Sequence, residues 1–261
     1  MITIPWDKIT ENPAPAQREP IALTIGVFDG IHIGHQKLIS KIVHNSIHAL
    51  PAICTFRQNP GTVLGIRPNP GSILSFRQKM LKFEELGVLR LVLIDFSFEI
   101  SKLTAEDFLG ILERAFQIRQ VAVGCNFHMG RGRATGVREL DSFLRASRTR
   151  LLIVPETQYH ERTVSSSRIR EAIIHGRFRE VRDMLNGEYR LDITEAKIEK
   201  TGSKAAISRR EIFQILPRQG SYRAMLLGPE GTELTEVRIG EERLEWDTRK
   251  DLRQTEICFC E

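Results

Sequence analysis

Residues 24–35 read T-I-G-V-F-D-G-I-H-I-G-H. An apolar run, residues 21–25, leads into it and predicts a buried strand of a parallel sheet. A turn with three glycines follows, and residues 36–43 then place apolar side chains on one face of a predicted helix. The local order is therefore strand, glycine-rich loop and helix.

This junction favours the binding of an anion. Free backbone N–H groups and the positive end of the helix dipole point at it, and glycines let a polyphosphate approach the backbone closely. His32 and His35, spaced as H-x-G-H, add two imidazoles that can donate to phosphate oxygens and stabilise charge during phosphoryl chemistry. An ordinary glycine turn and a zinc site stay open as alternatives, although no cluster of further Cys or His lies nearby. The G-x-G-x-x-G fingerprint of dinucleotide folds is absent.

The composition places the chain among globular proteins that are long enough for one large and one small domain. It has 261 residues, of which 41% are hydrophobic and 27% are charged. No apolar run approaches the roughly 18 to 20 residues of a membrane span, and the first 20 residues do not resemble a signal peptide. Four scattered cysteines predict reduced thiols and a cytoplasmic location.

The net charge of +5 favours small anionic substrates. Nucleic acid is the alternative partner for a basic chain, but basic and aromatic residues are not interleaved here. We therefore expect neither a nucleic-acid partner nor a membrane partner.

Strands and helices alternate beyond the first motif. Further strands are expected at residues 51–56, 88–95, 120–124 and 151–155, and helices at residues 75–86, 104–116 and 137–147. This alternation predicts a doubly wound α/β fold with a parallel sheet. In such folds ligands meet the carboxyl ends of the strands. The Gly/Pro-rich residues 61–74 are expected to form a lid or binding loop.

Two later stretches carry groups suited to phosphate. Asn126 follows the strand at 120–124 and offers a donor and an acceptor, which suits either a phosphate or a metal ion. Arg131 and Arg133 suit a pyrophosphate, although an ordinary basic turn is the alternative.

Residues 164–174 read V-S-S-S-R-I-R-E-A-I-I, in which one hydroxyl would simply cap a helix. Three hydroxyls followed by two arginines predict a second phosphate clamp.

The last seventy residues have a different hydrophobic pattern. Short alternating stretches at 190–200, 211–216, 221–227, 234–239 and 255–260 are separated by Gly- and Pro-containing turns. This pattern predicts a small antiparallel β-barrel or sandwich.

Together the motifs resemble those of the bacterial FAD synthetase family, across about residues 20–190. These FMN adenylyltransferases of the H-x-G-H nucleotidyltransferase superfamily are usually fused to a riboflavin kinase. The resemblance rests on G-x-F-D-G-x-H-x-G-H at 26–35, V-G-x-N-F at 123–127 and S-S-S-R-I-R at 165–170. The chain departs from the family pattern at Gln58 and Asn59, which stand where proline and histidine are usual.

The resemblance implies a nucleotidyltransferase domain over residues 1–188 and a reduced, kinase-like β-barrel over 189–261. The G-R-x-L-G-F-P-T-A-N stretch of the kinase is missing, so riboflavin kinase activity is expected to be lost. The implied reaction transfers AMP from ATP to FMN, giving FAD and pyrophosphate, with Mg²⁺ accompanying ATP. Another phosphorylated acceptor, or a non-catalytic flavin- or nucleotide-binding regulator, stays an alternative.

The resemblance also implies a set of site residues. The expected catalytic residues are His32, His35, Asn126, Ser166, Ser167 and Arg170. The expected ATP- and FMN-binding residues are Gly26, Val27, Phe28, Asp29, Gly30, Gly34, Phe56, Asn59, Pro60, Arg131, Arg133, Ser165 and Arg168. Metal ligands and oligomeric state are not implied.

Overall fold

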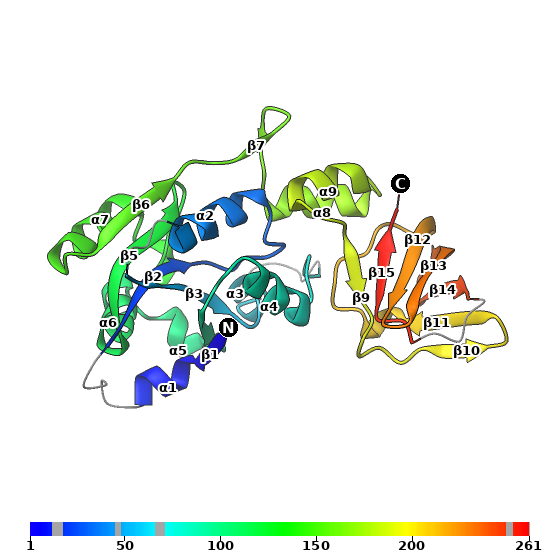
Figure 1. Ribbon diagram of the computed structural model, residues 1–261, viewed down its shortest axis with the longest axis horizontal. Helices are drawn as coiled ribbons and strands as arrows, with labels where there is room; N and C mark the ends of the chain where they lie inside the picture. The colour runs from blue at the N-terminus through cyan, green and yellow to red at the C-terminus, as the bar shows by residue number, and fades with distance from the viewer. Residues whose placement is uncertain (12–17, 45–47, 66–70, 249–252, 261) are drawn as a thin grey trace. The chain divides into compact units, whose positions relative to one another are not determined.

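A computed structural model describes residues 1–11, 18–44, 48–65, 71–248 and 253–260 (Figure 1). The chain divides into two compact units. The first is built from the described residues of Met1–Phe28, Gly34–Pro68 and Met80–Gln158. The second is built from those of Asp29–Ile33, Asn69–Lys79 and Tyr159–Glu261.

A parallel six-stranded sheet forms the centre of the first unit, in the order β1-β4-β3-β2-β5-β6. Its strands are β1 (Ile2–Pro5), β2 (Glu19–Ile25), β3 (Leu50–Phe56), β4 (Arg90–Ile94), β5 (Phe116–Gly124) and β6 (Arg150–Val154). The helices between them are α1 (Trp6–Glu11), α2 (Ile33–His44), α3 (Pro60–Val63), α4 (Phe76–Glu85), α5 (Phe98–Ser101), α6 (Ala105–Ala115) and α7 (Val137–Ala146). The predicted doubly wound α/β fold is confirmed.

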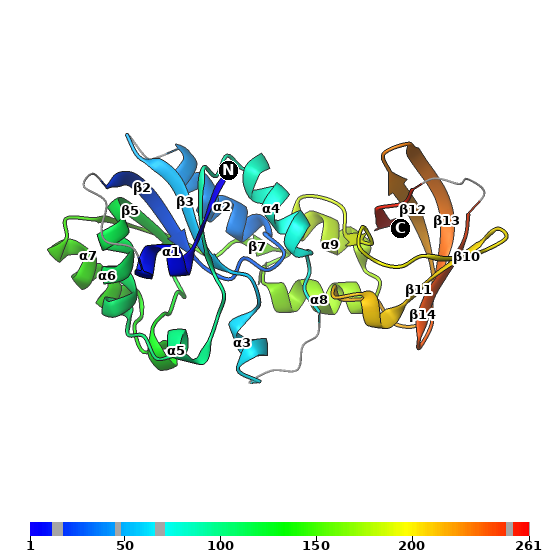
Figure 2. The same cartoon turned by 90° about the horizontal axis from the view of Figure 1, so that it is seen from below.

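The inner strands are buried on both faces. Consecutive residues of β2, β3 and β4 are buried, which requires cover above and below the sheet. Helices lie on both sides of it (Figures 1 and 2). Trp6 of α1 stacks on Phe108 of α6 with ring centroids 4.8 Å apart, which fixes one of these helical layers.

The strand order reverses at β2, which lies between β3 and β5. Doubly wound sheets bind ligands beyond the carboxyl ends of the strands at such a reversal. The loop that begins at Gly26 leaves β2 at this edge, and the loop that begins at Cys125 leaves β5 there. The topology thus brings two of the predicted motifs to the same edge of the sheet.

Helix starts follow the predicted capping chemistry. Thr104 caps α6, and its side chain accepts from Asp107 N at 3.1 Å. The Asp107 carboxylate in turn accepts from Thr104 N. Ser165 caps α8 (Ser166–Ile174) by accepting from Arg168 N at 3.3 Å. Both caps lie where the sequence predicts a helix to start.

The second unit contains an antiparallel sheet that curls into a half-barrel, in the order β10-β11-β14-β13-β12-β15-β9. Its strands are β9 (Arg190–Asp192), β10 (Glu199–Thr201), β11 (Lys204–Ser208), β12 (Gly220–Gly228), β13 (Gly231–Ile239), β14 (Arg243–Asp247) and β15 (Glu256–Phe259). A short hairpin, β7 (Gln158–Tyr159) and β8 (Arg162–Thr163), precedes α8, and α9 (Phe178–Leu185) follows it. The predicted antiparallel β domain is confirmed.

The apolar faces of α8 and α9 join the core of this sheet. Ile169, Ile173 and Val181 belong to the same buried cluster as the strand residues Ile257 and Phe259. The ring of Phe178 stacks on that of Phe259 with centroids 5.0 Å apart. These contacts explain why the second compact unit already begins near residue 159. The domain boundary after residue 188 stays a prediction.

Several predicted elements were wrong in detail. Residues 211–216 do not form a strand: a 3₁₀ turn at Arg209–Glu211 ends there, and Gln214 makes only an isolated bridge to Ser72. Strands β11 and β14 were not predicted. The helix α6 ends at Ala115, and β5 begins at Phe116 with no glycine or proline to mark the change.

The expected loop at 61–74 also differs from the structure. Its first residues belong to the short helix α3, which Asn59 caps, and residues 66–70 lie outside the described part of the chain. Among the described residues, none of the helices is long and apolar enough to cross a membrane.

Candidate active site

The glycine-rich loop leaves β2 alongside β3. Gly26 N donates to Cys54 O at 3.1 Å, and Thr55 Oγ1 donates to Val27 O at 3.2 Å. The next residue, Phe28, turns inward and is only 1% exposed. The start of the glycine-rich loop, residues 26–28, is therefore tied to the sheet at Gly26 and anchored in the core at Phe28.

His35 lies in the first turn of α2, directly after Gly34. Its ring meets the edge of Phe28 with centroids 5.2 Å apart, and Phe28 in turn meets Phe83 at 5.7 Å. Edge-to-face contacts of this kind fix the orientation of a ring. The first unit thus holds the imidazole of His35 at the positive end of the α2 dipole.

The middle of the loop, Asp29–Ile33, belongs to the second unit. Ile73 N donates to Asp29 Oδ1 at 3.0 Å, and Arg170 donates to Asp29 Oδ2. Ser166 Oγ donates to the carbonyl oxygen of Asp29 at 2.8 Å. The structure therefore brings three predicted site residues together, with Asp29 bound by groups of the chain itself.

His32 is buried, with 7% of its surface exposed. Burial lowers the pKa of its imidazole to about 4, because desolvation disfavours the charged form. At neutral pH the ring is therefore uncharged, with one nitrogen that donates and one that accepts. His32 can donate a hydrogen bond to a phosphate oxygen but does not bring a full positive charge to it.

The start of α8 uses most of its polar side chains internally. Ser165 caps the helix, and Arg168 Nη1 donates to Tyr159 O at 2.8 Å and to Arg162 O at 2.7 Å. Ser167 is exposed in the first turn of the helix. Of the three serines, Ser167 has the side chain that faces solvent at a helix N-terminus, where an anion is favoured.

Arg170 reaches two parts of the second unit. Besides its ion pair with Asp29, its Nε donates to Gly71 O at 3.2 Å. Only 16% of the arginine side chain and 12% of the aspartate side chain are exposed. The predicted clamp arginine therefore holds the loop that precedes His32.

The carboxyl ends of β5 and β6 bring Asn126 and Glu156 together. Asn126 Nδ2 donates to Glu156 Oε1, and both residues are exposed. Sequence reasoning selected Asn126 but missed Glu156. The available signal was its position two residues after β6, the strand beside β5. An amide oxygen and a carboxylate are ligands suited to Mg²⁺.

Arg131 and Arg133 lie in a short 3₁₀ turn, and both are exposed. The turn is fixed to the segment before α6, because Arg131 N donates to Leu103 O at 2.8 Å. At Gly130, where φ is +75°, a Cβ atom would lie 2.8 Å from Ala105 N, so only glycine fits. A rigid base thus presents two guanidinium groups to solvent.

Three predicted binding residues, Phe56, Asn59 and Pro60, lie at the end of β3 and in the segment that follows it. The ring of Phe56 meets Phe96 with centroids 5.5 Å apart, so the half-buried Phe56 packs within the first unit. Asn59 Oδ1 accepts from Gly61 N at 3.0 Å and caps α3, in which Pro60 is the first residue. These contacts give Asn59 and Pro60 a structural part, and their proposed contact with substrate stays a prediction.

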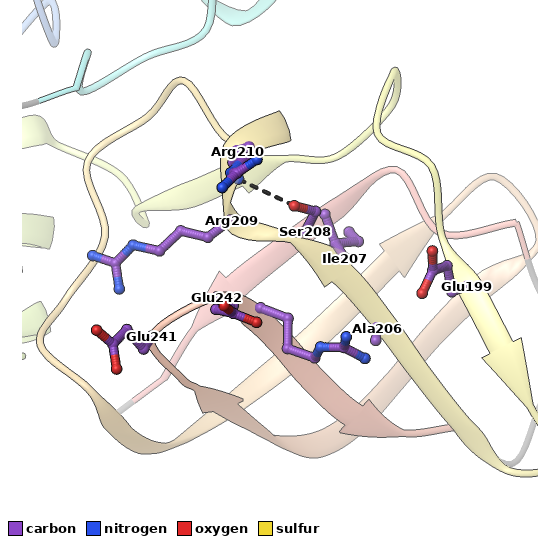
Figure 3. A pocket seen from close by; sticks show the side chains of 9 residues that line it. Glu199, Ala206, Ile207, Ser208, Arg209, Arg210, Glu241 and Glu242 are labelled. Atoms are coloured by element: carbon purple, nitrogen blue, oxygen red, sulfur yellow. Dashed lines mark hydrogen bonds between the residues drawn. The ribbon is translucent and has the colours of Figure 1, made fainter.

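A separate cavity of about 570 Å³ lies on the half-barrel (Figure 3). It is lined by Glu199, residues 206–210 and residues 241–243. Arginine and glutamate side chains are both present, so their charges largely cancel. None of the predicted site residues lines this cavity.

The parallel sheet, its reversal at β2 and the H-x-G-H turn at the start of α2 are the features expected of an α/β nucleotidyltransferase. The sequence profile of the FAD synthetase family matches residues 14–168, which is more than half of the chain. The chain belongs to the FAD synthetase family.

Two curated relatives come from Listeria monocytogenes. One is a bifunctional riboflavin kinase/FMN adenylyltransferase, 25% identical over 77% of this chain and 66% of the relative. The other is an FAD synthetase, 26% identical over 77% of this chain and 79% of the relative. The chain thus spans just under two thirds of the length of the bifunctional relative.

The fold is also similar to that of the crystal structure of a macrolide-efflux protein from Streptococcus pneumoniae. The TM-score is 0.82 at 21% identity, and the match covers 99% of this chain and 89% of that one. At this identity the likeness concerns the fold alone. It includes the half-barrel as well as the nucleotidyltransferase sheet.

Proposed function

We propose that this chain transfers AMP from ATP to FMN and releases FAD and pyrophosphate. The observation that carries the proposal is the family match over residues 14–168, which includes both the H-x-G-H turn and the start of α8. The basic composition of the chain agrees with two polyanionic substrates.

The proposed reaction needs no covalent enzyme intermediate. A phosphate oxygen of FMN attacks the α-phosphorus of ATP in line, the bond between the α-phosphorus and the bridging oxygen breaks, and pyrophosphate leaves with the electron pair. The attacking group is already an anion, so no strong base is required. Catalysis then consists of positioning and of stabilising charge on the phosphate oxygens.

His32 and His35 are the proposed donors to those oxygens. The low pKa of His32 supports a role as a neutral hydrogen-bond donor. The place of His35 in the first turn of α2 supports a role beside the helix dipole. The backbone of residues 26–30 is the proposed lining for adenine and ribose.

We assign the pyrophosphate side to the start of α8. The exposed hydroxyl of Ser167 supports direct contact with a phosphate. The contacts of Ser166 and Arg170 with Asp29 support a part in shaping the loop that carries His32. Arg131 and Arg133 are proposed as further cationic contacts because their turn is rigid and exposed.

Mg²⁺ is the proposed metal, bound together with ATP. Mg²⁺ is commonly held by one or two protein oxygen ligands plus substrate phosphates. Asn126 and Glu156 fit this requirement, because an amide and a carboxylate lie in contact at the ends of β5 and β6. When bound, the ion would neutralise charge on the phosphates of ATP.

We further propose that the chain works in the cytoplasm, as two domains divided after residue 188, without riboflavin kinase activity. All four cysteines, which lie in the described part of the chain, are free. The absence of the G-R-x-L-G-F-P-T-A-N stretch supports the loss of the kinase.

One assay tests this proposal. The purified full-length chain is incubated with ATP, Mg²⁺ and either FMN or riboflavin, and the products are separated by chromatography. We expect FAD and pyrophosphate from FMN, and no product from riboflavin. AMP transfer only to another phosphorylated acceptor would replace the proposed substrate, and flavin binding without pyrophosphate release would indicate a regulator. Conversion of riboflavin to FMN would show that kinase activity is retained.

A further inference from the structure

Residues 71–79 belong to the same compact unit as the half-barrel and are hydrogen-bonded to it. Ser72 N donates to Phe213 O at 3.0 Å, and Ile215 N donates to Ser72 O at 2.9 Å. At Gly71, where φ is +89°, a Cβ atom would lie 2.5 Å from Ile215 N. Backbone meets backbone here so closely that a side chain at position 71 has no room.

Gln214 is the centre of this junction and is 5% exposed. Its Nε2 lies 3.0 Å from Ile73 O, 3.1 Å from Gln78 Oε1 and 3.0 Å from Arg190 O. Its Oε1 accepts from Asp192 N at 2.7 Å. One buried amide thus joins the 71–79 segment to β9, and losing it would leave several buried polar groups unpaired.

Charged side chains reinforce the same junction. Arg77 donates to Asp192 and to Glu256, each at 2.9 Å, and Ser75 Oγ donates to Asp192 at 2.5 Å. The hydrogen bonds of Arg77 and Ser75 hold the pKa of the Asp192 carboxyl below its usual value despite its burial. The segment is therefore held at Ser72, Ser75 and Arg77 as well as at Ile73.

The same segment holds the loop that carries His32. Ile73 N donates to the carboxylate of Asp29. The side chain of Ile73 packs against Gly30 so closely that a Cβ atom on Gly30 would lie 3.0 Å from it. Arg170 also donates to both Gly71 O and the Asp29 carboxylate. A continuous path of contacts therefore runs from Gln214 through Ile73 to Asp29.

The loop needs such support because its backbone is strained. Ile31 has a φ of +42° and is 1% exposed. This left-handed conformation is unfavourable for a β-branched residue and costs of order 1–3 kcal/mol. Strained residues persist only where the surrounding structure holds them, and His32 follows Ile31 directly.

From this path we infer that the half-barrel serves the transfer reaction by positioning the loop at 29–32, with Gln214 as a positioning residue. This role gives the half-barrel a part in catalysis that does not depend on kinase activity. An effect of Gln214 on the rate of FAD formation rests on the proposed function, whereas its effect on the ordering of residues 29–32 does not.

The matched comparison is Gln214→Ala against Gln254→Ala. Gln254 is also 5% exposed in the same unit, and it accepts from Trp246 Nε1 and donates to Thr248 Oγ1, each at 3.1 Å. Both substitutions remove a buried amide, but only Gln214 contacts the 71–79 segment. For each full-length variant we would measure the melting temperature, kcat and KM for FAD formation, and amide hydrogen exchange of peptides covering residues 28–35.

We expect Gln214→Ala to lower kcat by about tenfold or more, since small displacements of reacting groups are costly. Exchange across residues 29–34 should become faster. We expect Gln254→Ala to lose comparable stability while its kcat stays within about twofold of the wild type. Equal effects of both variants on kcat and exchange, or no effect of Gln214→Ala on either, would overturn the inference.

A second pair of variants covers a failure of Gln214→Ala to fold. Gly71→Ala drives a Cβ against Ile215 N, whereas at Gly202 (φ +61°) a Cβ would meet nothing within 4 Å. Both substitutions strain a left-handed residue, so only the clash differs. Gly71→Ala should speed exchange at residues 29–34 and Gly202→Ala should not. If the wild type forms no FAD, the proposed function fails, and the exchange comparison still decides the positioning role.

Discussion

Arg170 and Asp29 form an ion pair that joins helix α8 to the loop before α2. The two residues are 141 positions apart in the sequence, and both side chains are largely buried. The guanidinium also donates to Gly71 O. The pair therefore links three chain segments, and its main effect is on the shape of the loop that presents His32.

Replacing Arg170 should be costly for stability as well as for activity. Arg170→Ala leaves the Asp29 carboxylate buried without its cation, and we expect a loss of about 3 kcal/mol in the free energy of unfolding. Urea denaturation measures this value. Arg179→Ala, which removes an exposed arginine of α9, is the control and should change stability by less than about 0.5 kcal/mol.

The coupling between the two residues can be isolated. In a double-mutant cycle with Asp29→Asn, the loss caused by Arg170→Ala should become much smaller, because the amide carries no charge. A loss of equal size in both backgrounds would show that the ion pair does not hold the loop.

The pKa of His32 predicts a specific pH dependence of stability. The unfolded chain binds the His32 proton near pH 6.5, whereas the folded protein binds it only near pH 4. His32 therefore does not reduce the free energy of unfolding above about pH 6.5. As the pH drops towards 4, its protonation in the unfolded chain lowers that free energy by about 3 kcal/mol. We expect His32→Gln to lack this component. Parallel pH profiles of unfolding free energy for wild type and variant would contradict the buried, neutral state of His32.

Gly30 should not tolerate a side chain. Its φ is +85°, and a Cβ atom would lie 3.0 Å from Ile73 Cδ1. We expect Gly30→Ala to cost about 1–3 kcal/mol of stability from backbone strain and crowding. Gly132→Ala is the control, because that glycine is also left-handed (φ +63°) but has no neighbour within 4 Å of a Cβ. Thermal unfolding compares the two, and a similar loss in both variants would show that the contact with Ile73 is unimportant.

Local chemistry explains what could be predicted from the sequence. The apolar run before Gly26 forms β2, Thr104 and Asp107 form a capping box, and Ser165 caps α8. Each of these features depends on neighbouring residues only. The glycine loop between β2 and α2 is predictable for the same reason.

Contacts between distant segments explain what could not be predicted. No spacing in the sequence indicates that Arg170 pairs with Asp29, or that Gln214 turns inward and interrupts the strand expected at 211–216. Glu156 looks like an ordinary loop residue until β6 is placed beside β5. The packing of α8 and α9 with the half-barrel likewise depends on tertiary contacts.

We propose that the H-x-G-H turn of this chain performs AMP transfer to FMN, and the decisive measurement is the rate of FAD formation by His35→Ala. His44→Ala is the matched control, because it removes an exposed histidine at the other end of the same helix. We predict that His35→Ala lowers kcat by roughly 10² to 10³, the usual effect of losing one donor to transition-state charge, while His44→Ala is unchanged. A wild type that forms FAD and a His35→Ala variant that forms it at nearly the same rate would show that His35 does not take part in the transfer.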